Sequence, residues 1–354
     1  MPVLRRHFPL ISIVVPVHNS SATLEKCIYS LCGQTYKDIE ILLINNGSTD
    51  DSLELCRKFA SEDNRIIVDD LFEKGVSIAR NRGIELATGT FVSFVDADDW
   101  IDLNICEFFA NLNAKYNYDL FCFSAQYHKK KKTTVSYIFD NDEELFSQKQ
   151  KEELQIKVFA PKAPFFNYKT NTRFAGSAWA KFYKRDLLLK YNLRFAPETI
   201  ISEDCLFNTL ALDHFGRIGY TKKYFYHYIQ CDNSAQNRYR PNSEKYFSFV
   251  IENMQAWLED TGKDQRFIDA ANCLFVHYLF GIMKEDIFHK ENCISIVHKV
   301  RMLDMLCSDG IFAKTLQDVK LQYFNFWENQ LIYLLRKKCF IILSILMNLI
   351  LKFF

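Results

Sequence analysis

Three aspartates follow directly on a short apolar run, and their spacing is suited to holding a cation. The run is Phe91–Val95, whose composition is that of a buried strand, and the acids are Asp96, Asp98 and Asp99. Carboxylates repel one another and resist burial, so a cluster of them usually neutralises a cation. Hard oxygen ligands favour Mg²⁺ or Mn²⁺, and these metals commonly bridge to a diphosphate. The residues alone also allow a solvated acidic turn in which Asp99 caps the next helix.

The chain around this cluster alternates between strand and helix patterns. Four apolar runs have the length and composition of strands, at residues 11–17, 39–44, 65–68 and 90–95. Helical patterns lie between them, at residues 24–31, from Ser48 onward and at residues 77–87. In the first of these helices apolar side chains recur at helical spacing, and the Ser48 hydroxyl could cap the second. Continuous apolar strands joined by helices are typical of a buried, largely parallel sheet.

Polar residues gather where three of these strands end. His18 and Asn19 follow the first strand, Asn45–Ser48 follow the second, and the acidic cluster follows the fourth. Ligands of parallel sheets bind beyond the carboxyl ends of the strands. The pattern therefore predicts one shared site at this edge, independently of any family.

Composition and charge narrow the class of protein. With 354 residues, the chain has room for one domain and an appendage, and its 49% apolar and 25% charged residues are those of a folded globular protein. The net charge of +1 gives no field that would attract nucleic acid. The eleven cysteines form no CxxC pair, so we expect small buried apolar residues in a reducing cytoplasm. The apolar N-terminal run has no cleavage site and is predicted to be a strand, not a signal peptide.

A series of short motifs resembles glycosyltransferase family 2, in the family's order and spacing. The motifs are Val14–Asn19, Gln34–Ile41, Asn46–Ser52, Gly75–Gly83, Asp96–Asp99, Ser177–Tyr183 and Ser202–Phe207. The resemblance covers about residues 10–235 and implies a GT-A fold, which is a Rossmann-like, mostly parallel α/β sheet flanked by helices. It also implies a nucleotide-sugar donor, a divalent metal (Mn²⁺ or Mg²⁺) and inverting transfer of a hexose.

The resemblance assigns roles to the acids. Asp98 matches the position at which the family holds its metal, and Asp96 matches one that contacts the ribose or assists the metal. Asp204 matches the catalytic base, with Glu203 beside it. A base that faces the anomeric carbon opposite the leaving group is what an inverting reaction requires. Without the resemblance, Glu203 and Asp204 would be surface acids that open a helix.

Other residues match donor-binding positions of the family. Arg80 matches a residue that touches the diphosphate, for which a guanidinium fork is suited. Pro16, Val17 and Asn19 are expected to line the base and ribose by shape and backbone contacts. Asn46 departs from the family, which more often has an Asp that accepts the N3–H of uracil. The Asn oxygen can still accept that hydrogen bond, but the preference for uridine becomes less certain.

Trp179 is a candidate platform for the acceptor sugar, because apolar sugar faces stack on indole. Its alternative is a core tryptophan of the sheet. The processive synthases of the family carry a Gln-x-x-Arg-Trp element in this region, and this chain has none. We therefore expect one sugar to be added per binding event.

Four segments are predicted along the chain. They are the nucleotide-sugar-binding half at 1–110, the acceptor half with the base at 111–235, a helical extension at 236–330 and an amphipathic C-terminal helix at 331–354.

The C-terminal segment has an apolar stretch, Cys339–Leu351, of 13 residues. That is short of the ~20 residues that span a bilayer. Four cations flank it, at Arg336, Lys337, Lys338 and Lys352. A polar stripe recurs every four residues, at Ser344, Asn348 and Lys352. This pattern fits a helix that lies in the membrane interface, and equally a helix that docks on the protein's own apolar surface.

The expected function is transfer from UDP-Glc, UDP-Gal or an N-acetylated relative to a glycan, with a lipid-linked acceptor in bacterial O-antigen, lipooligosaccharide or capsule synthesis. The expected location is the cytoplasmic face of the inner membrane. One rival is a phosphatase of the haloacid dehalogenase type. Its Asp-x-Asp motif ends the first strand and has a Thr where this chain has Trp100. The other rival, a non-catalytic carbohydrate-binding or scaffold protein, would need neither the acidic cluster nor Asp204.

Overall fold

The structure is a computed structural model that describes residues 10–129, 132–159, 173–230, 239–308 and 310–350. These residues form two compact units. The first contains the described residues up to Val158 together with 173–230, and the second contains those from 239 onward. The predicted division at residue 110 falls inside the first unit, and the predicted extension and C-terminal helix share the second.

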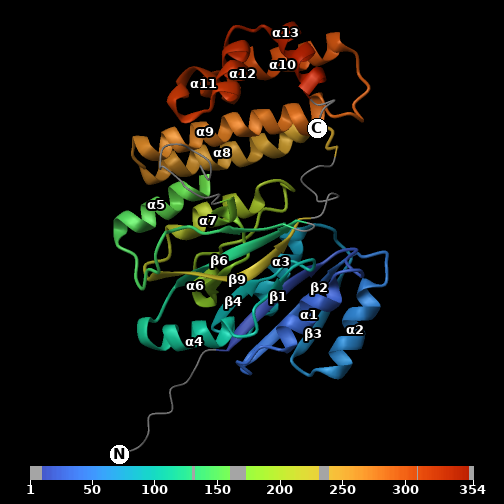
Figure 1. Ribbon diagram of the computed structural model, residues 1–354, viewed down its shortest axis with the longest axis vertical. Helices are drawn as coiled ribbons and strands as arrows, with labels where there is room; N and C mark the ends of the chain where they lie inside the picture. The colour runs from blue at the N-terminus through green and yellow to red at the C-terminus, as the bar shows by residue number, and fades with distance from the viewer. Residues whose placement is uncertain (1–9, 130–131, 160–172, 231–238, 309, 351–354) are drawn as a thin grey trace, which may run out of the picture. The chain divides into compact units, whose positions relative to one another are not determined.

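A mixed sheet is the centre of the first unit (Figure 1). Its described strands are β1 (Ile11–Val17), β2 (Ile39–Asn46), β3 (Ile66–Leu71), β4 (Phe91–Phe94), β5 (Trp100–Ile101), β6 (Leu120–Lys129), β7 (Lys132–Ser136), β8 (Lys181–Lys184) and β9 (Ile218–Ile229). They lie in the order β3-β2-β1-β4-β8-β6-β9-β5, with β7 beside β6.

The two halves of this sheet differ in strand direction. The neighbours β3, β2, β1 and β4 are all parallel, which confirms the prediction for the first hundred residues. Beyond β4, strand β8 is antiparallel to both β4 and β6, while β9 is parallel to β6 and antiparallel to β5. Strand β4, which the acidic cluster follows, is therefore the strand at which the sheet changes from parallel to antiparallel pairing.

Helices flank the sheet of the first unit. They are α1 (Leu24–Cys32), α2 (Ser52–Glu62), α3 (Val76–Leu86), α4 (Ile105–Tyr116), α5 (Gln148–Phe159), α6 (Arg185–Lys190) and α7 (Glu203–Leu212). Helix α2 begins four residues after the predicted cap, Ser48, so that prediction was wrong. The Ser48 hydroxyl accepts a hydrogen bond from the Asn19 N–H at 3.1 Å instead, because the loop is held by the segment after β1.

Close packing of α3 on β1 depends on a glycine. A Cβ atom added at Gly83 would lie 2.2 Å from the Cγ1 atom of Val14 on β1. Strands β1, β2 and β4 are buried along almost their whole length, as continuous apolar runs predict. Cys27 and Cys56 are buried free thiols in this core, in line with the interpretation of the cysteines.

The second unit is helical where the structure describes it. Its helices are α8 (Ser243–Thr261), α9 (Gln265–Ile282), α10 (Ile296–Ser308), α11 (Gly310–Asp318), α12 (Phe326–Arg336) and α13 (Phe340–Ile350). Helices α8 and α9 lie side by side, and α13 packs on α10 and α12 (Figure 1). No helix in the described ranges is both long enough and apolar enough to cross a bilayer.

Helix α13 is apolar on two faces, which corrects the predicted polar stripe. Ser344 is fully buried, because it lies on the same inward face as Leu343 and Met347. The outward face carries large aliphatic side chains that are between 38% and 63% exposed, at Ile341, Ile342, Ile345 and Leu346. The side chains of Asn348 and Lys352, the other members of the stripe, lie outside the described residues.

Candidate active site

The three acids after β4 point in different directions. Asp98 is exposed and the Asp96 side chain is 28% exposed, whereas Asp99 is only 1% exposed. Asp99 does not cap a helix, since its carboxylate accepts hydrogen bonds from the Tyr226 hydroxyl at 2.7 Å and the Ile229 N–H at 2.8 Å. Two of the acids are thus open to a ligand, and the third is part of the core.

The surroundings of Asp96 and Asp98 raise the pKa of both carboxyl groups. Although the Asp98 side chain reaches solvent, partial burial and the charge of Asp96 raise the pKa of Asp98 to about 6. Burial also raises the pKa of Asp96. The Asp98 carboxylate interacts with its own backbone N–H, and within the described part of the chain it forms no hydrogen bond or ion pair with another residue. It is therefore available to a cation.

The chemistry of these donors fits a divalent cation that is shared with a substrate. Among the described residues, no three Asp, Glu, His or Cys side chains converge closely enough to hold a metal by themselves. Mg²⁺ typically takes only one or two carboxylates from a protein and completes its shell with phosphates and water. Asp98 and Asp96 supply that number of oxygen ligands.

Arg80, on α3, connects the acidic turn to the start of α7. Its guanidinium is buried and donates to Asp96 and Glu203, at 3.2 Å each, and to Asp204. Burial alone would lower the pKa of Arg80, but the three carboxylates outweigh it and raise that pKa further. Here the arginine holds carboxylates together. Its predicted contact with a diphosphate stays a prediction.

Asp204 lies in the first turn of α7, as its helix-opening alternative expects, but its side chain points back toward the acidic turn. Besides Arg80, its carboxylate accepts a hydrogen bond from the Ala178 N–H at 3.0 Å. Burial and the charge of Glu203 raise the pKa of Asp204 to about 6, against the opposing effect of Arg80. Such a carboxylate is ionised at neutral pH yet basic enough to accept a proton.

A buried polar network supports the segment that contacts Asp204, and the sequence did not reveal it. The Lys181 ammonium donates to the Ser177 carbonyl at 2.7 Å, and the Asn208 amide donates to the same carbonyl at 3.1 Å. The Tyr183 hydroxyl donates to the Ala178 carbonyl at 3.0 Å. Burial lowers the pKa of Lys181 to about 8. The sequence signal for this network was Lys181, a lysine next to apolar residues where β8 begins.

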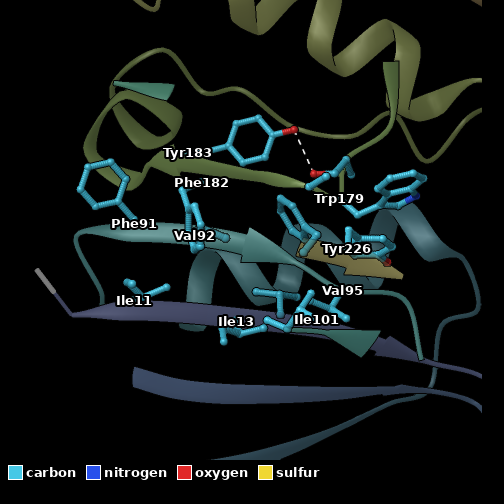
Figure 2. Close-up of a cluster of buried hydrophobic side chains, with 14 of the residues drawn as sticks. Ile11, Ile13, Phe91, Val92, Val95, Ile101, Trp179, Phe182, Tyr183 and Tyr226 are labelled. Carbon is cyan, nitrogen blue, oxygen red and sulfur yellow. Dashed lines mark hydrogen bonds between the residues drawn. The ribbon is translucent and has the colours of Figure 1, made fainter. Parts of the chain in front are cut away.

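Trp179 packs inside the protein. Its ring is 5% exposed and stacks on Tyr226, with centroids 4.3 Å apart and an interplanar angle of 12°, and on Phe174 at 5.8 Å. Figure 2 shows the Trp179 and Tyr226 rings together in the apolar cluster. This is the core packing that the sequence left as the alternative, and a role in acceptor binding stays a prediction.

The residues expected around the nucleotide lie at the ends of β1 and β2 and in the loop after β1. Val17 is fully buried, so only its backbone could reach a ligand, while Pro16 is half-buried. Asn19 has the left-handed φ of 49°, and its side-chain oxygen accepts the Thr49 N–H at 2.8 Å. These contacts join the two loops into one surface.

Asn46 is buried and already forms one hydrogen bond. Its side-chain oxygen accepts the Gly75 N–H at 2.9 Å, which fixes the turn before α3. A carbonyl oxygen has a second lone pair, so the predicted pairing with a nucleobase remains chemically open. That role stays a prediction.

Comparisons with known proteins relate this chain to glycosyltransferases. Residues 12–181 match the family model described as glycosyl transferase family 2. The chain is 27% identical over 312 residues to the putative glycosyltransferase EpsH of Bacillus subtilis (strain 168), which covers 87% of this chain and 86% of that protein. It is 28% identical over 221 residues to the cholesterol galactosyltransferase of Borreliella burgdorferi, covering 61% of this chain and 59% of that protein.

A solved structure shares the fold. S. aureus TarS 1–349 in complex with UDP-GlcNAc superposes with a TM-score of 0.68 at 18% sequence identity, covering 96% of this chain and 90% of that one.

Proposed function

Since this chain belongs to glycosyltransferase family 2, we propose that it transfers one hexose from a nucleoside-diphosphate sugar to a glycan, with inversion at the anomeric carbon. One observation carries the proposal: Arg80 joins Asp96 to Asp204 beyond the carboxyl ends of the parallel strands, and Asp98 lies open in the same turn as Asp96. A phosphatase and a non-catalytic scaffold are no longer alternatives, because the family is one of transferases.

The proposed donor is a uridine diphosphate sugar, either UDP-Glc, UDP-Gal or an N-acetylated relative. Two observations support it. TarS, which has the same fold, was solved with UDP-GlcNAc. In addition, the carboxyl ends of β1 and β2 bring the backbone of Pro16 and Val17 and the Asn46 side chain to one edge of the sheet.

Asp98 and Asp96 would hold Mn²⁺ or Mg²⁺, since members of this family commonly use divalent metal ions. Bound there, the metal would stabilise negative charge on the departing diphosphate. The protein's own contribution is to leave the Asp98 carboxylate open. Its neighbours are engaged, since Arg80 pairs with Asp96 and the Ile229 N–H donates to Asp99. We assign Arg80 a second task, contact with the diphosphate, for which its donors are suited.

Asp204 is the proposed base. As the acceptor hydroxyl oxygen forms its bond to the anomeric carbon, the bond from that carbon to the diphosphate breaks, and the hydroxyl proton passes to the Asp204 carboxylate. The Ala178 N–H and Arg80 orient this carboxylate, and Glu203 contributes to its basicity. Attack from the face opposite the leaving group gives inversion.

Calorimetry with UDP, in the presence and absence of Mn²⁺, tests the donor and the metal together. We expect binding that is strengthened by Mn²⁺ and lost in excess chelator. A screen of nucleotide sugars for hydrolysis then identifies the sugar. Failure of every uridine nucleotide to bind would overturn the proposed donor.

We propose that the acceptor is a lipid-linked glycan and that the enzyme acts at the cytoplasmic face of the inner membrane. A relative whose name states that it galactosylates cholesterol supports a membrane-bound acceptor. The outward face of α13 supports contact with the membrane itself, because it exposes four aliphatic side chains next to Lys337 and Lys338. A second copy of the chain fits this face less well. Its four exposed aliphatic side chains are far fewer than the roughly 20–30 residues that each subunit of a stable dimer buries.

A further inference from the structure

We propose that Asp99 and Tyr226 are positioning residues that fix the acidic turn carrying Asp96 and Asp98. The inference rests on the proposed function, because it concerns the turn that would bind the donor and its metal. It gives the third acid of the cluster a task that differs from that of its two neighbours.

Asp99 is buried, and both of its carboxylate oxygens are used inside the protein. One accepts the Tyr226 hydroxyl at 2.7 Å and the other accepts the Ile229 N–H at 2.8 Å. The Asp99 N–H also donates to the Asp96 carbonyl at 3.0 Å, which closes the turn. A buried carboxylate is costly unless its hydrogen bonds serve a purpose, and these bonds all end on the turn or on β9.

The Tyr226 hydroxyl joins the two ends of the turn. It donates to the Asp99 carboxylate and accepts the Asp96 N–H at 3.2 Å. A phenol can donate and accept at once, which a phenylalanine at this place could not do. The backbone of Asp96, from which the ligand-facing side chain projects, is thereby tied to the core.

The same tyrosine contacts the segment that orients the base. Its ring stacks on Trp179 with centroids 4.3 Å apart (Figure 2), and Trp179 directly follows Ala178, whose N–H donates to Asp204. Tyr226 therefore sets the separation between the turn that holds the donor and the carboxylate that takes the proton. Errors of about 1 Å in such a separation can cost ~10²-fold in rate.

Another tyrosine of β9, near the start of the strand, provides a control for a purely structural role. Tyr220 is also buried, and its hydroxyl is hydrogen-bonded to the Ser124 hydroxyl at 2.7 Å and to the Ile138 N–H at 3.1 Å. None of these partners belongs to the acidic turn. Tyr220→Phe removes one hydroxyl with three partners, since the Tyr220 hydroxyl also donates to the Phe139 carbonyl at 3.3 Å, and Tyr226→Phe removes one hydroxyl with two. The control should therefore cost at least as much stability as Tyr226→Phe.

The test compares Tyr226→Phe, Asp99→Asn, their double variant and Tyr220→Phe in the full chain. We measure the Kd of UDP with and without Mn²⁺ by calorimetry, kcat with the active donor, and Tm. Outer-shell partners of metal ligands typically contribute 10–100-fold to affinity or activity. We expect Tyr226→Phe and Asp99→Asn to weaken Mn²⁺-dependent UDP binding by about tenfold or more. The double variant should bind UDP no more weakly than the single variant with the higher Kd. Tyr220→Phe should bind UDP like wild type, although its Tm falls at least as far as that of Tyr226→Phe.

Equal Kd values for Tyr226→Phe and Tyr220→Phe would overturn the positioning role while leaving the proposed function intact. If Asp99→Asn does not fold, Tyr226→Phe, which removes a single oxygen, decides the matter alone. A wild-type protein whose UDP binding ignores Mn²⁺ would instead overturn the metal assignment, and the positioning role with it.

Discussion

At the residue scale, the site combines carboxylates of similar chemistry with very different surroundings. Asp98 is open, Asp99 is locked into the core, and Asp204 is shared between Arg80 and a backbone N–H. The residue types at these positions were predictable from the motifs. Their directions were not, because a pattern of acids in a turn does not say which of them points inward.

Asp98→Asn should abolish Mn²⁺-dependent UDP binding and most activity, because an amide oxygen lacks the charge that a hard cation favours. The fold should persist, since the Asp98 carboxylate has no hydrogen bond or ion pair to another described residue. Calorimetry and Tm measure both effects. Asp186→Asn, at an exposed acid on α6, is the control and should match wild type. Full wild-type turnover in excess chelator would contradict the metal role.

Asp204→Asn should keep donor and metal binding while the chemical rate falls by ~10²–10⁴-fold, the usual contribution of a general base. Single-turnover kinetics at saturating donor measure that rate. NMR coupling constants of the wild-type product should show a β linkage from an α-linked donor. If donor affinity collapses and turnover of bound donor is unchanged, Asp204 is a binding residue and not the base.

The pH profile should report the raised pKa of Asp204. The base acts only when deprotonated, so kcat should rise with pH through about 6 and fall tenfold per pH unit well below it. Saturating donor and Mn²⁺ keep the metal ligands deprotonated during the titration. The residual activity of Asp204→Asn should lack this limb. A wild-type rate that is flat between pH 5 and 8 would rule out this assignment.

At the element scale, the parallel half of the sheet was predictable because each strand is a continuous apolar run between helices of clear period. Helix α2 was misplaced by four residues because Ser48 is engaged by the loop after β1, a contact distant in sequence. The pairing of β9 with β6 and β5 was beyond prediction for the same reason, since nothing local specifies it.

Gly83→Ala tests the close contact between α3 and β1. The new methyl would overlap Val14, so the free energy of unfolding should fall by about 1–3 kcal/mol, as is usual for an overpacked core. Urea denaturation measures this change. Val14→Ala in the same chain should restore part of the loss, and Val14→Ala alone is the control. If the double variant is only the sum of the two single losses, the overlap with Val14 is not the cause.

At the scale of the whole molecule, the enzyme class was readable from the sequence, but the partners were not. Acceptor and membrane contacts depend on surfaces, and a periodic pattern cannot tell an outward apolar face from an inward one. Ser344 illustrates this, because the stripe that it belongs to was expected to face outward and the residue is buried.

Replacing Ile341, Ile342 and Ile345 by Gln should release the protein from vesicles that contain anionic lipid. Each side chain contributes up to ~1.5–3 kcal/mol when fully buried in an apolar phase, and the packing face of α13 stays intact. Vesicle sedimentation measures binding, and high salt should weaken it only partly. Leu103→Gln with Leu145→Gln, at exposed positions of the first unit, is the control. A wild-type dimer that the triple variant converts to a monomer, with unchanged vesicle binding, would show that another copy covers this face.

The change of strand direction at β4 has an evolutionary consequence. The backbone ladder between β4 of the parallel half and β8 of the mixed half has two residue pairs in the described part of the chain, Phe91 with Lys184 and Val92 with Tyr183. A ladder this short fixes the neighbouring backbone at few positions, so substitutions that preserve the contacts of Arg80 and Tyr226 should leave the parallel half in place. If the proposed function holds, lineages that share this architecture would exchange one acceptor for another while inheriting the proposed nucleotide-binding half almost unaltered.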